Sequence, residues 1–521
     1  MLASEFLPAR FNVAAHFVDR NVDEGRAEAT AFFCADRNLT YGDVLELVNR
    51  TGNALLDLGV EMDDRVLMAC LDGPEFVGTF WGAIKIGAVP VPVNTLLRRQ
   101  DYAYLLNDSR ARAAVVSAAL LPEVAPALEE ARHLRHVLVA GGPGHGYMSW
   151  DRRVEHASAA LAAAPTSRDD AAFWLYSSGS TGFPKGAVHL HHDMVVCLET
   201  YAKQVLGILP TDRVYSAAKL FFAYGLGNAL YFPMGVGAES VLVPHRPTPE
   251  AAFEVIARNR PTIFFAVPTL YAGMLAVKEA EKRFDFSSLR LCVSAGEALP
   301  EELYLRWRER FGVEIVDGIG TTECLHMFIS NRPGAVRPGT SGQVVPGYEA
   351  RLVDDDGQPV PAGEIGNLRI KGDSTMAFYW NQHDKNKVTL YGPWIVTGDK
   401  YREQDGTYWY CGRSDDMLKV GGIWVSPIEV EAALVGHPAV LESAVVGHED
   451  ADGLVKPKAF VVLKDQALAT ATLAADLQSF VKDKIAPYKY PRWIEFIPDL
   501  PKTATGKIQR FKLRPGAAEE P

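Results

Sequence analysis

An apolar run at residues 171–175 leads directly into a loop of glycines, hydroxyl side chains and one lysine at residues 176–186. Glycines let such a loop turn with positive φ and bring backbone N–H groups close to an anion, while the hydroxyls and the lysine add donors and charge. A flexible linker is the plainer interpretation, but a linker seldom follows a buried strand. The pattern therefore predicts a strand followed by a phosphate-binding loop. The loop residues expected at the phosphates are Ser177, Ser178, Gly179, Ser180, Thr181, Gly182 and Lys185.

This loop does not match the P-loop pattern, which needs a Gly-Lys-Ser/Thr ending so that the hydroxyl can hold magnesium. Lys185 is followed by Gly186, and the Gly506–Lys507 pair is followed by Ile508. The phosphate-binding loop must therefore belong to another class of nucleotide-binding protein.

The length of 521 residues exceeds the roughly 250–300 residues that one hydrophobic core usually serves, so we expect at least two domains. Strand-like apolar runs alternate with amphipathic stretches, which predicts an α/β chain with largely parallel sheets. The expected strands are 65–71, 88–93, 113–116, 214–217, 262–267, 289–293 and 314–316, with a helix from Pro74 and another at 301–311. Short strands and turns at 351–409 indicate a smaller β-rich subdomain.

A second break is expected near residues 413–416, where charged residues stand between Gly412 and the Gly421–Gly422 pair. The pattern after it has helices at 427–434 and 473–484 and strands at 441–446, 458–463 and 493–496. A segment of about 100 residues is large enough to fold as its own unit. The expected domains are therefore 1–413 and 414–521, with a hinge near 414–416.

Charge and composition exclude several classes of protein. The net charge of −11 argues against non-specific nucleic-acid binding, so a polyanionic ligand needs local basic groups. The N-terminus shows no signal peptide, and we expect a cytoplasmic protein. The uncharged segment 220–238 approaches membrane-spanning length, but its four glycines, Asn228 and Pro233 favour a buried core segment around a pocket.

The cysteines are far apart, and no pair has CxxC or zinc-finger spacing. Most have an apolar neighbour, so we expect buried, reduced thiols. They are Cys34, Cys70, Cys197, Cys292, Cys324 and Cys411.

Three further motifs offer groups that bind nucleotides. Residues 317–323 follow an expected strand, and their glycines could lie flat against a purine or an aromatic ring. In this motif Thr322 offers a hydroxyl to phosphate and Glu323 a carboxylate to magnesium. Asp399 ends an apolar run where it could bind ribose hydroxyls, and Arg413 follows shortly after. The loop 501–507 ends in Lys507. Taken singly, each motif could equally be an ordinary capped turn or a solvated surface residue.

Taken together and in this order, these segments resemble the adenylate-forming enzymes, a superfamily of acyl-CoA synthetases, peptide-synthetase adenylation domains and beetle luciferases. The resemblance covers nearly the whole chain. It implies a large N-terminal domain of stacked α/β subdomains plus a β-rich subdomain, and a small mobile α+β C-terminal domain. It also implies ATP, Mg²⁺ and coenzyme A as cofactor and co-substrates.

The resemblance also implies a role for each motif. Thr181 and Lys185 belong to the phosphate loop, and Lys507 bridges the acyl carboxylate and the α-phosphate. Thr322 contacts phosphate and Glu323 binds magnesium. Glu323, Thr181, Lys185 and Lys507 carry the catalysis. Asp399 and Arg413 hold the ribose, Asp415 is the hinge residue, and Lys419, Gly421 and Gly422 line the thiol tunnel. The rest of the nucleotide site comprises Ser294, Ala295, Gly296, Glu297, Asp317, Gly318, Ile319, Gly320 and Thr321.

The expected acyl pocket combines aromatic walls with small residues, which suits a flat ring. Its residues are Phe221, Phe222, Ala223, Tyr224, Gly225, Gly320, His326 and Met327. Family members often have histidine where Phe222 stands. The combination resembles benzoate-CoA ligases and implies an ATP-dependent aryl-acid:CoA ligase acting on a small aromatic carboxylic acid. The alternative is that these aromatic residues only pack the core.

Two other activities use the same first step: a stand-alone aryl-acid adenylation enzyme that loads a carrier protein, and a luciferase-like oxygenase. The sequence leaves the ring substituents open, because one small group is worth only about 1–3 kcal/mol in an apolar pocket. The oligomeric state is also open, with a homodimer as one candidate. Neither nucleic acid nor stable membrane insertion is expected.

Overall fold

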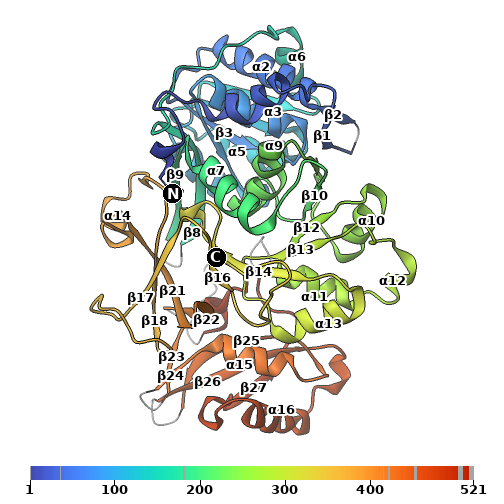
Figure 1. The fold of residues 1–521 in the computed structure, drawn as a ribbon, viewed down its shortest axis with the longest axis vertical. Coiled ribbons are helices and arrows are strands. Elements are labelled where there is room, and N and C mark those ends of the chain that lie inside the picture. The colour runs from blue at the N-terminus through green and yellow to red at the C-terminus, as the bar shows by residue number, and fades with distance from the viewer. Residues whose placement is uncertain are drawn as a thin grey trace.

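The structure is a computed structural model, and it describes residues 2–35, 37–179, 182–414, 416–420, 423–450, 454–502 and 508–514. Figure 1 shows the N-terminal elements at one end of the elongated molecule and the C-terminal helices and strands at the other. Between these ends, the sheets carry the segments that were predicted to bind the nucleotide and the acid.

A five-stranded parallel sheet forms the first layer, in the order β4-β3-β5-β6-β7. Its strands are β3 (Arg65–Ala69), β4 (Val89–Pro92), β5 (Ala113–Ser117), β6 (His136–Ala140) and β7 (Met148–Ser149). Its helices are α2 (Tyr41–Leu56), α3 (Pro74–Lys85), α4 (Arg99–Asp108), α5 (Leu121–Leu128) and α6 (Trp150–His156). Proline suits the first turn of α3 because its missing N–H has no partner there anyway.

A nine-stranded sheet forms the second layer, parallel at its centre and antiparallel at both edges. Its strands are β1 (Thr30–Phe33), β2 (Asn38–Thr40), β10 (Arg213–Ser216), β11 (Glu239–Val241), β12 (Ile263–Ala266), β13 (Leu291–Ser294), β14 (Ile315–Gly320), β15 (Met327–Ser330) and β16 (Gln343–Val344). The helices beside it are α7 (Asp193–Cys197), α8 (Ala223–Leu226), α9 (Phe232–Val236), α10 (Pro249–Asn259), α11 (Pro268–Ala276), α12 (Ala280–Arg283) and α13 (Glu301–Phe311).

Two antiparallel sheets complete the larger part of the fold. The first has the order β19-β9-β8 and consists of β8 (Ala171–Gly179), β9 (Gly182–Leu190) and β19 (Phe378–Tyr379). The second consists of β17 (Glu349–Val353), β18 (Ile365–Lys371), β20 (Leu390–Tyr391), β21 (Trp394–Gln404) and β22 (Thr407–Arg413), with α14 (His383–Thr389) beside it. The second sheet is the expected β-rich subdomain.

The C-terminal elements have a hydrophobic core of their own, which includes Leu434, Val461 and Leu477. They are β23 (Leu418–Val420), β24 (Ile423–Val425), α15 (Pro427–Val435), β25 (Val440–Glu449), β26 (Val455–Leu463), α16 (Ala471–Lys484) and β27 (Trp493–Phe496). The predicted α/β fold with a small α+β C-terminal unit is thereby confirmed.

Segment 220–238 folds as three short helical pieces, with a π-helical turn at Gly227–Tyr231 between α8 and α9. Among the described residues, no helix is long and apolar enough to cross a membrane. None of the six cysteines forms a disulfide with another, but the prediction that they are buried was wrong for Cys34, which is only half-buried directly after β1.

Candidate active site

The β8–β9 hairpin carries the predicted phosphate loop. Lys185 stands opposite Ser177 in the hairpin, and its Nζ lies 4.8 Å from the ring centroid of Tyr379. Tyr379 belongs to β19 and pairs with Ala187 of β9. Burial lowers the pKa of Lys185, and the nearby carboxylate of Glu323 opposes this shift. The structure therefore brings Lys185 and Glu323 into one electrostatic group.

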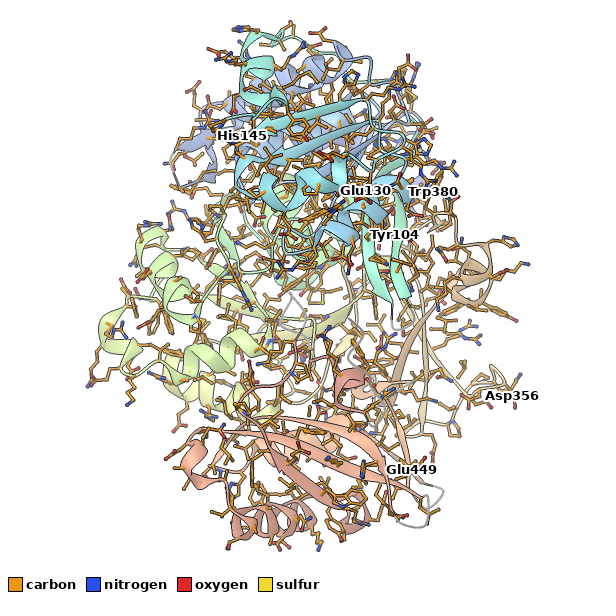
Figure 2. The ribbon with its side chains drawn as sticks, turned by 180° about the vertical axis from the view of Figure 1, so that it is seen from behind. Tyr104, Glu130, His145, Asp356, Trp380 and Glu449 are labelled. Atoms are coloured by element: carbon orange, nitrogen blue, oxygen red, sulfur yellow. The ribbon has the colours of Figure 1, made fainter. Side chains whose placement is uncertain are left out.

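Two aromatic residues support this hairpin from outside. The Tyr104 hydroxyl of α4 donates to the Pro184 carbonyl at 3.1 Å, and its ring stacks on Phe183 with centroids 4.5 Å apart. Trp380, which follows β19, donates its indole N–H to the Asp108 carbonyl at 2.9 Å. Figure 2 labels Tyr104 and Trp380 near the hairpin. Helix α4 thus fixes the strand that carries Lys185.

Glu323 lies in the turn between β14 and β15. The Tyr379 hydroxyl donates to Glu323 Oε1 at 2.6 Å, and the Met376 N–H donates to the Glu323 carbonyl at 2.7 Å. Burial alone would raise the pKa of Glu323, but the Tyr379 hydrogen bond and the Lys185 charge outweigh it and hold the pKa below its usual value. The buried Ser177 hydroxyl lies beside this carboxylate without a hydrogen bond of good geometry among the described residues. The carboxylate is therefore ionised and suited to a hard cation.

The donor chemistry fits Mg²⁺. No group of three or more histidine, cysteine, aspartate or glutamate side chains in the described part of the chain is arranged to hold a metal. Mg²⁺ commonly binds through only one or two carboxylates, and takes its other ligands from substrate phosphates and water. A single ionised Glu323 beside a phosphate loop meets that requirement.

The strands β13 and β14 bring two nucleotide segments side by side. Ser294 and Asp317 are paired in the parallel register of these strands, at their carboxyl ends. Burial raises the pKa of Asp317 to about 8, although Ser294 and two backbone N–H groups oppose it. Gly296 follows with φ of +94°, a conformation that favours glycine. Asp317 is 5% exposed.

The two predicted ribose residues face each other on neighbouring strands. Asp399 of β21 pairs with Arg413 of β22, and Arg413 Nη1 donates to Asp399 Oδ1 at 3.1 Å and to the Thr397 carbonyl at 3.3 Å. Asp399 is buried, while Arg413 is exposed. Both residues were predicted to bind the ribose, but their direct contact was not predictable from the sequence.

The predicted acyl segments also meet. The ring centroids of Tyr224 and His326 are 5.7 Å apart, and the Tyr224 hydroxyl donates to the Val293 carbonyl at 3.1 Å. Residues 222–224 and 319–323 are half-buried between buried neighbours, as expected for the walls of a substrate site. A Cβ on Gly320 would lie 2.5 Å from the His326 carbonyl oxygen, so this position requires glycine. Phe221, Gly225 and Met327 are buried beside these walls.

His326 is neutral and fixed. Burial lowers its pKa to about 3, and its Nε2 lies 3.1 Å from the Asn228 amide oxygen. Because that oxygen accepts, Nε2 carries the proton. Its ring also lies 5.2 Å from that of Tyr201. Sequence analysis did not select Asn228, Tyr201 or Tyr379 as site residues. An amide within an otherwise apolar run was the available signal for Asn228, whereas nothing in the sequence distinguished Tyr201 or Tyr379 from core aromatic residues.

Several predicted site residues lie outside the described residues: Ser180, Thr181, Asp415, Gly421, Gly422 and Lys507. The side chains of Ser178 and Lys419 are likewise not described. Ile508, the first described residue after this C-terminal gap, donates its N–H to Glu297 Oε1 at 3.3 Å. This contact brings the C-terminal unit to the Ser294–Glu297 segment.

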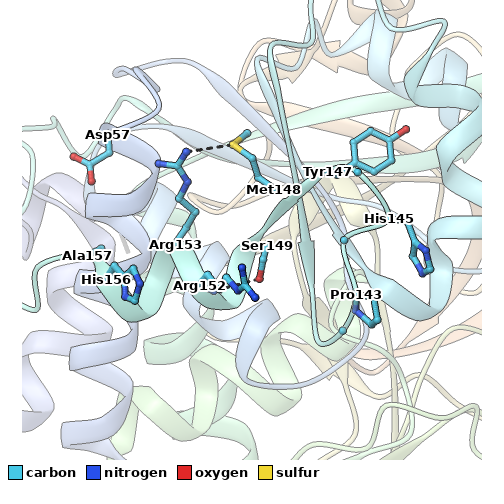
Figure 3. A pocket seen from close by; sticks show the side chains of 13 residues that line it. Asp57, Pro143, His145, Tyr147, Met148, Ser149, Arg152, Arg153, His156 and Ala157 are labelled. Carbon is cyan, nitrogen blue, oxygen red and sulfur yellow. Dashed lines mark hydrogen bonds between the residues drawn. The ribbon is translucent and has the colours of Figure 1, made fainter.

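Two surface pockets of about 620 and 610 Å³ lie away from these residues. The first is lined by the loop before α6 and by α6 itself, and Figure 3 shows Arg153 directed toward Met148, with Nη2 3.6 Å from Sδ. None of the predicted site residues lines either pocket, so the size of a pocket does not identify the chemistry here.

Comparison with known proteins agrees with this geometry. The AMP-binding enzyme family matches residues 18–380, and the AMP-binding enzyme C-terminal domain matches residues 429–507. The chain belongs to this family, the adenylate-forming enzymes that include the acyl-CoA synthetases.

Individual relatives extend the comparison over the full length. The chain is 55% identical over 511 residues to the benzoate–CoA ligase of Thauera aromatica, covering 98% of this chain and 96% of that protein. A solved anthranilate CoA ligase in complex with anthranoyl-AMP has a TM-score of 0.96 and 47% identity, covering 99% of both chains. A benzoate CoA ligase from Burkholderia xenovorans LB400 has a TM-score of 0.90 and 49% identity, covering 97% of this chain and all of that one.

Proposed function

We propose that this protein is an ATP-dependent aryl-acid:CoA ligase that acts on benzoate or a substituted benzoate. The carboxylate attacks the α-phosphorus of ATP to form an acyl adenylate and pyrophosphate, and CoA then displaces AMP to give an aryl-CoA thioester. The observation that carries the proposal is the meeting of Tyr224 and His326 beside the turn that holds Glu323. That arrangement supports an aromatic-walled acyl site next to the nucleotide motifs.

The residues of the site address a specific obstacle, because both reactants are anions. Two like charges about 4 Å apart repel by roughly 4 kcal/mol at an effective dielectric near 20. Mg²⁺, held by Glu323, would supply positive charge at the phosphates. Lys185 adds a second positive group, and Thr181 and Thr322 are assigned as phosphate donors. Lys507 is assigned to the acyl carboxylate and the α-phosphate.

The remaining residues of the site are assigned to binding and orienting the nucleotide and the aromatic acid. We assign Asp399 and Arg413 to the ribose, and the segments 294–297 and 317–321 to the rest of the nucleotide. The neutral His326 is held by Asn228, and we assign its fixed ring to one wall of the site for the aromatic ring of the substrate acid. Phe222 is assigned as an aromatic plug between the acyl pocket and the thiol tunnel, which includes Lys419, Gly421 and Gly422.

We further propose that residues 1–413 and 414–521 act as two domains that rotate about Asp415. By sequence, Lys507 and residues 419–422 both belong to the proposed domain 414–521, yet each is assigned to the same acyl carbon at a different stage. The Ile508–Glu297 hydrogen bond supports an arrangement in which the Lys507 end of that unit adjoins the nucleotide site.

A pyrophosphate-release assay over benzoate, hydroxybenzoates, aminobenzoates and short aliphatic acids tests the proposal. We expect release with aromatic acids and its dependence on Mg²⁺, followed by CoA thioester formation. Turnover of aliphatic acids alone would refute the aromatic assignment. Adenylate formation without discharge by CoA would instead indicate a carrier-protein partner.

Lys507→Ala tests the catalytic assignment. Loss of one well-placed electrostatic group commonly costs about 10²–10³ in rate, so adenylation should collapse while CoA still discharges a supplied acyl adenylate. Near-normal pyrophosphate release by this variant would contradict the role of Lys507.

A further inference from the structure

A buried histidine–aspartate pair lies at the far end of β9, outside the motifs of the candidate active site. His189 Nδ1 is 2.7 Å from Asp193 Oδ2, and both side chains are fully buried. Asp193, at the start of α7, also accepts the Leu190 N–H at 3.1 Å. Burying such a polar pair is costly unless its hydrogen bonds are made, so the pair needs an explanation.

The other ring nitrogen reaches the nucleotide turn. His189 Nε2 lies 2.8 Å from the Thr322 carbonyl oxygen, which can only accept, so Nε2 donates. The ring is stacked on Phe173, with centroids 5.1 Å apart and planes inclined by 16°. Asp193, Phe173 and Thr322 therefore fix the imidazole on three sides.

Successive side chains of β9 point to opposite faces, and this alternation explains how one strand contacts the Thr322–Cys324 turn at two places. Lys185, Ala187 and His189 are spaced by two residues, so their side chains share a face of the strand. Tyr379 pairs with Ala187 and therefore shares that face as well. Lys185 and Tyr379 meet Glu323 at one end, and His189 meets Thr322 at the other.

The turn needs such support because its backbone is unusual. Leu325, directly after the Thr322–Cys324 turn, has φ of +65° although it is not glycine and is fully buried. Such a conformation costs of order 1–3 kcal/mol and persists only where the surrounding structure holds it. Within the described residues, hydrogen bonds hold the turn at the Thr322 carbonyl, the Glu323 carboxylate and the Glu323 carbonyl.

We propose that His189, oriented by Asp193, is a positioning residue that fixes the Thr322 carbonyl and thereby aims the Thr322 hydroxyl and the Glu323 carboxylate at the Mg²⁺-bound phosphates. The inference rests on the proposed function for the nucleotide, but not on the identity of the acid. His189 itself touches neither substrate nor metal ion.

Two substitutions of His189 distinguish the effect of its N–H donor from the effect of its side-chain shape. His189→Leu removes the side-chain donor and leaves the Thr322 carbonyl with only the Leu325 N–H, 3.1 Å away, whereas His189→Gln keeps an N–H donor. Loss of a residue that orients a metal ligand typically costs 10–100-fold in metal affinity. We therefore expect His189→Leu to weaken Mg·ATP binding by about 10–100-fold in calorimetry without any acid present. His189→Gln should recover most of that loss.

His191→Leu is the matched control. His191 is also buried, two residues further along, and its Nδ1 accepts the Val13 N–H at 3.1 Å, away from the turn. His191→Leu should lower thermal stability by about as much as His189→Leu does, but it should leave Mg·ATP affinity unchanged. Amide hydrogen exchange at residues 322–325 of the ligand-free protein gives a second readout, and it should accelerate in His189→Leu but not in His191→Leu.

The outcomes are distinct. Folded His189→Leu with Mg·ATP affinity within twofold of the native chain overturns the proposal, as does an equal loss in His191→Leu. If His189→Leu does not fold, Asp193→Asn decides, because it keeps the ring in place but weakens its orientation. Mg·ATP affinity reduced at least fivefold in Asp193→Asn supports the proposal, and a smaller change overturns it. If the native chain itself binds no Mg·ATP, the proposed function fails instead.

Discussion

Glu431 and Arg510 form a two-point ion pair inside the C-terminal unit. Arg510 Nε lies 2.9 Å from Glu431 Oε1 and Nη2 lies 2.7 Å from Oε2, with side chains only 18% and 10% exposed. Glu431 Oε1 also accepts the Val445 N–H at 2.7 Å. One carboxylate thus joins α15, β25 and the segment that follows Lys507.

Glu431→Ala removes every one of these acceptors and leaves a guanidinium without its counter-charge. Removing one partner of a buried pair commonly costs about 3–5 kcal/mol, far more than breaking an exposed pair. Whole domains are stable by only about 5–15 kcal/mol. We therefore expect the C-terminal unit of this variant to remain folded but to open far more often.

Native-state hydrogen exchange in β25 and β26 measures that opening. A loss of about 3–5 kcal/mol corresponds to exchange that is faster by roughly two to four orders of magnitude, at 1.36 kcal/mol for each factor of ten. Glu431→Met combined with Arg510→Leu should regain much of the loss, because an apolar pair of similar volume avoids the unpaired charge.

The control variant is Glu349→Ala, which removes an ion pair of the same length on the surface. Lys371 Nζ lies 2.7 Å from Glu349 Oε1, with side chains 40% and 55% exposed. Its exchange rates should match those of the native chain. If Glu431→Ala also leaves exchange in β25 and β26 within threefold, the argument from burial is wrong.

Three further variants probe other parts of the molecule. Ala223→Leu should raise KM for substituted benzoates more than KM for ATP, since overpacking costs about 1–3 kcal/mol at the ring site only; equal losses for all substrates would indicate a folding defect. Asp415→Pro should spare adenylation but let acyl adenylate accumulate in single-turnover kinetics, because proline restricts the backbone expected to rotate; equal slowing of both half-reactions would move the hinge elsewhere. Burial raises the pKa of Asp72 to about 6, and Lys219 at 3.8 Å opposes it only in part, so the contribution of Asp72 to stability is fully present below about pH 4 and lost as pH rises through about 6. Asp72→Asn should therefore gain stability relative to the native chain across that range, and a pH-independent difference in unfolding midpoints would refute this.

The elements of the fold were predictable because their signals are local. The helix expected at 301–311 and the strand at 493–496 match α13 and β27, since each is bounded by residues that start or stop it. Periodicity also identified β3, β5 and β26 to within a few residues. The sequence could not reveal β19, because two residues become a strand only when β9 lies beside them.

The residues of the candidate site also fall into two groups: those that a local sequence pattern identifies and those that only a distant contact reveals. Motif residues such as Lys185 and Glu323 were found because glycines and charged groups stand out against apolar runs. Tyr379 and His189 were not, because each acts through a contact with a residue far away in the chain, 56 residues for Tyr379 and 133 for His189. Periodicity cannot report which distant carbonyl or carboxylate a buried side chain reaches.

The pairing of β19 with β9 also sets an order of events while the chain is being made. The strand that continues the phosphate loop ends at Leu190, and its edge partner begins only at Phe378. At about 5–20 residues per second, a ribosome needs roughly 10–40 seconds to add the residues between them. During that interval β9 has an open edge, and the hydroxyl that Tyr379 donates to Glu323 does not yet exist. A nascent chain released before residue 379 would therefore carry the phosphate loop without the strand that completes its sheet.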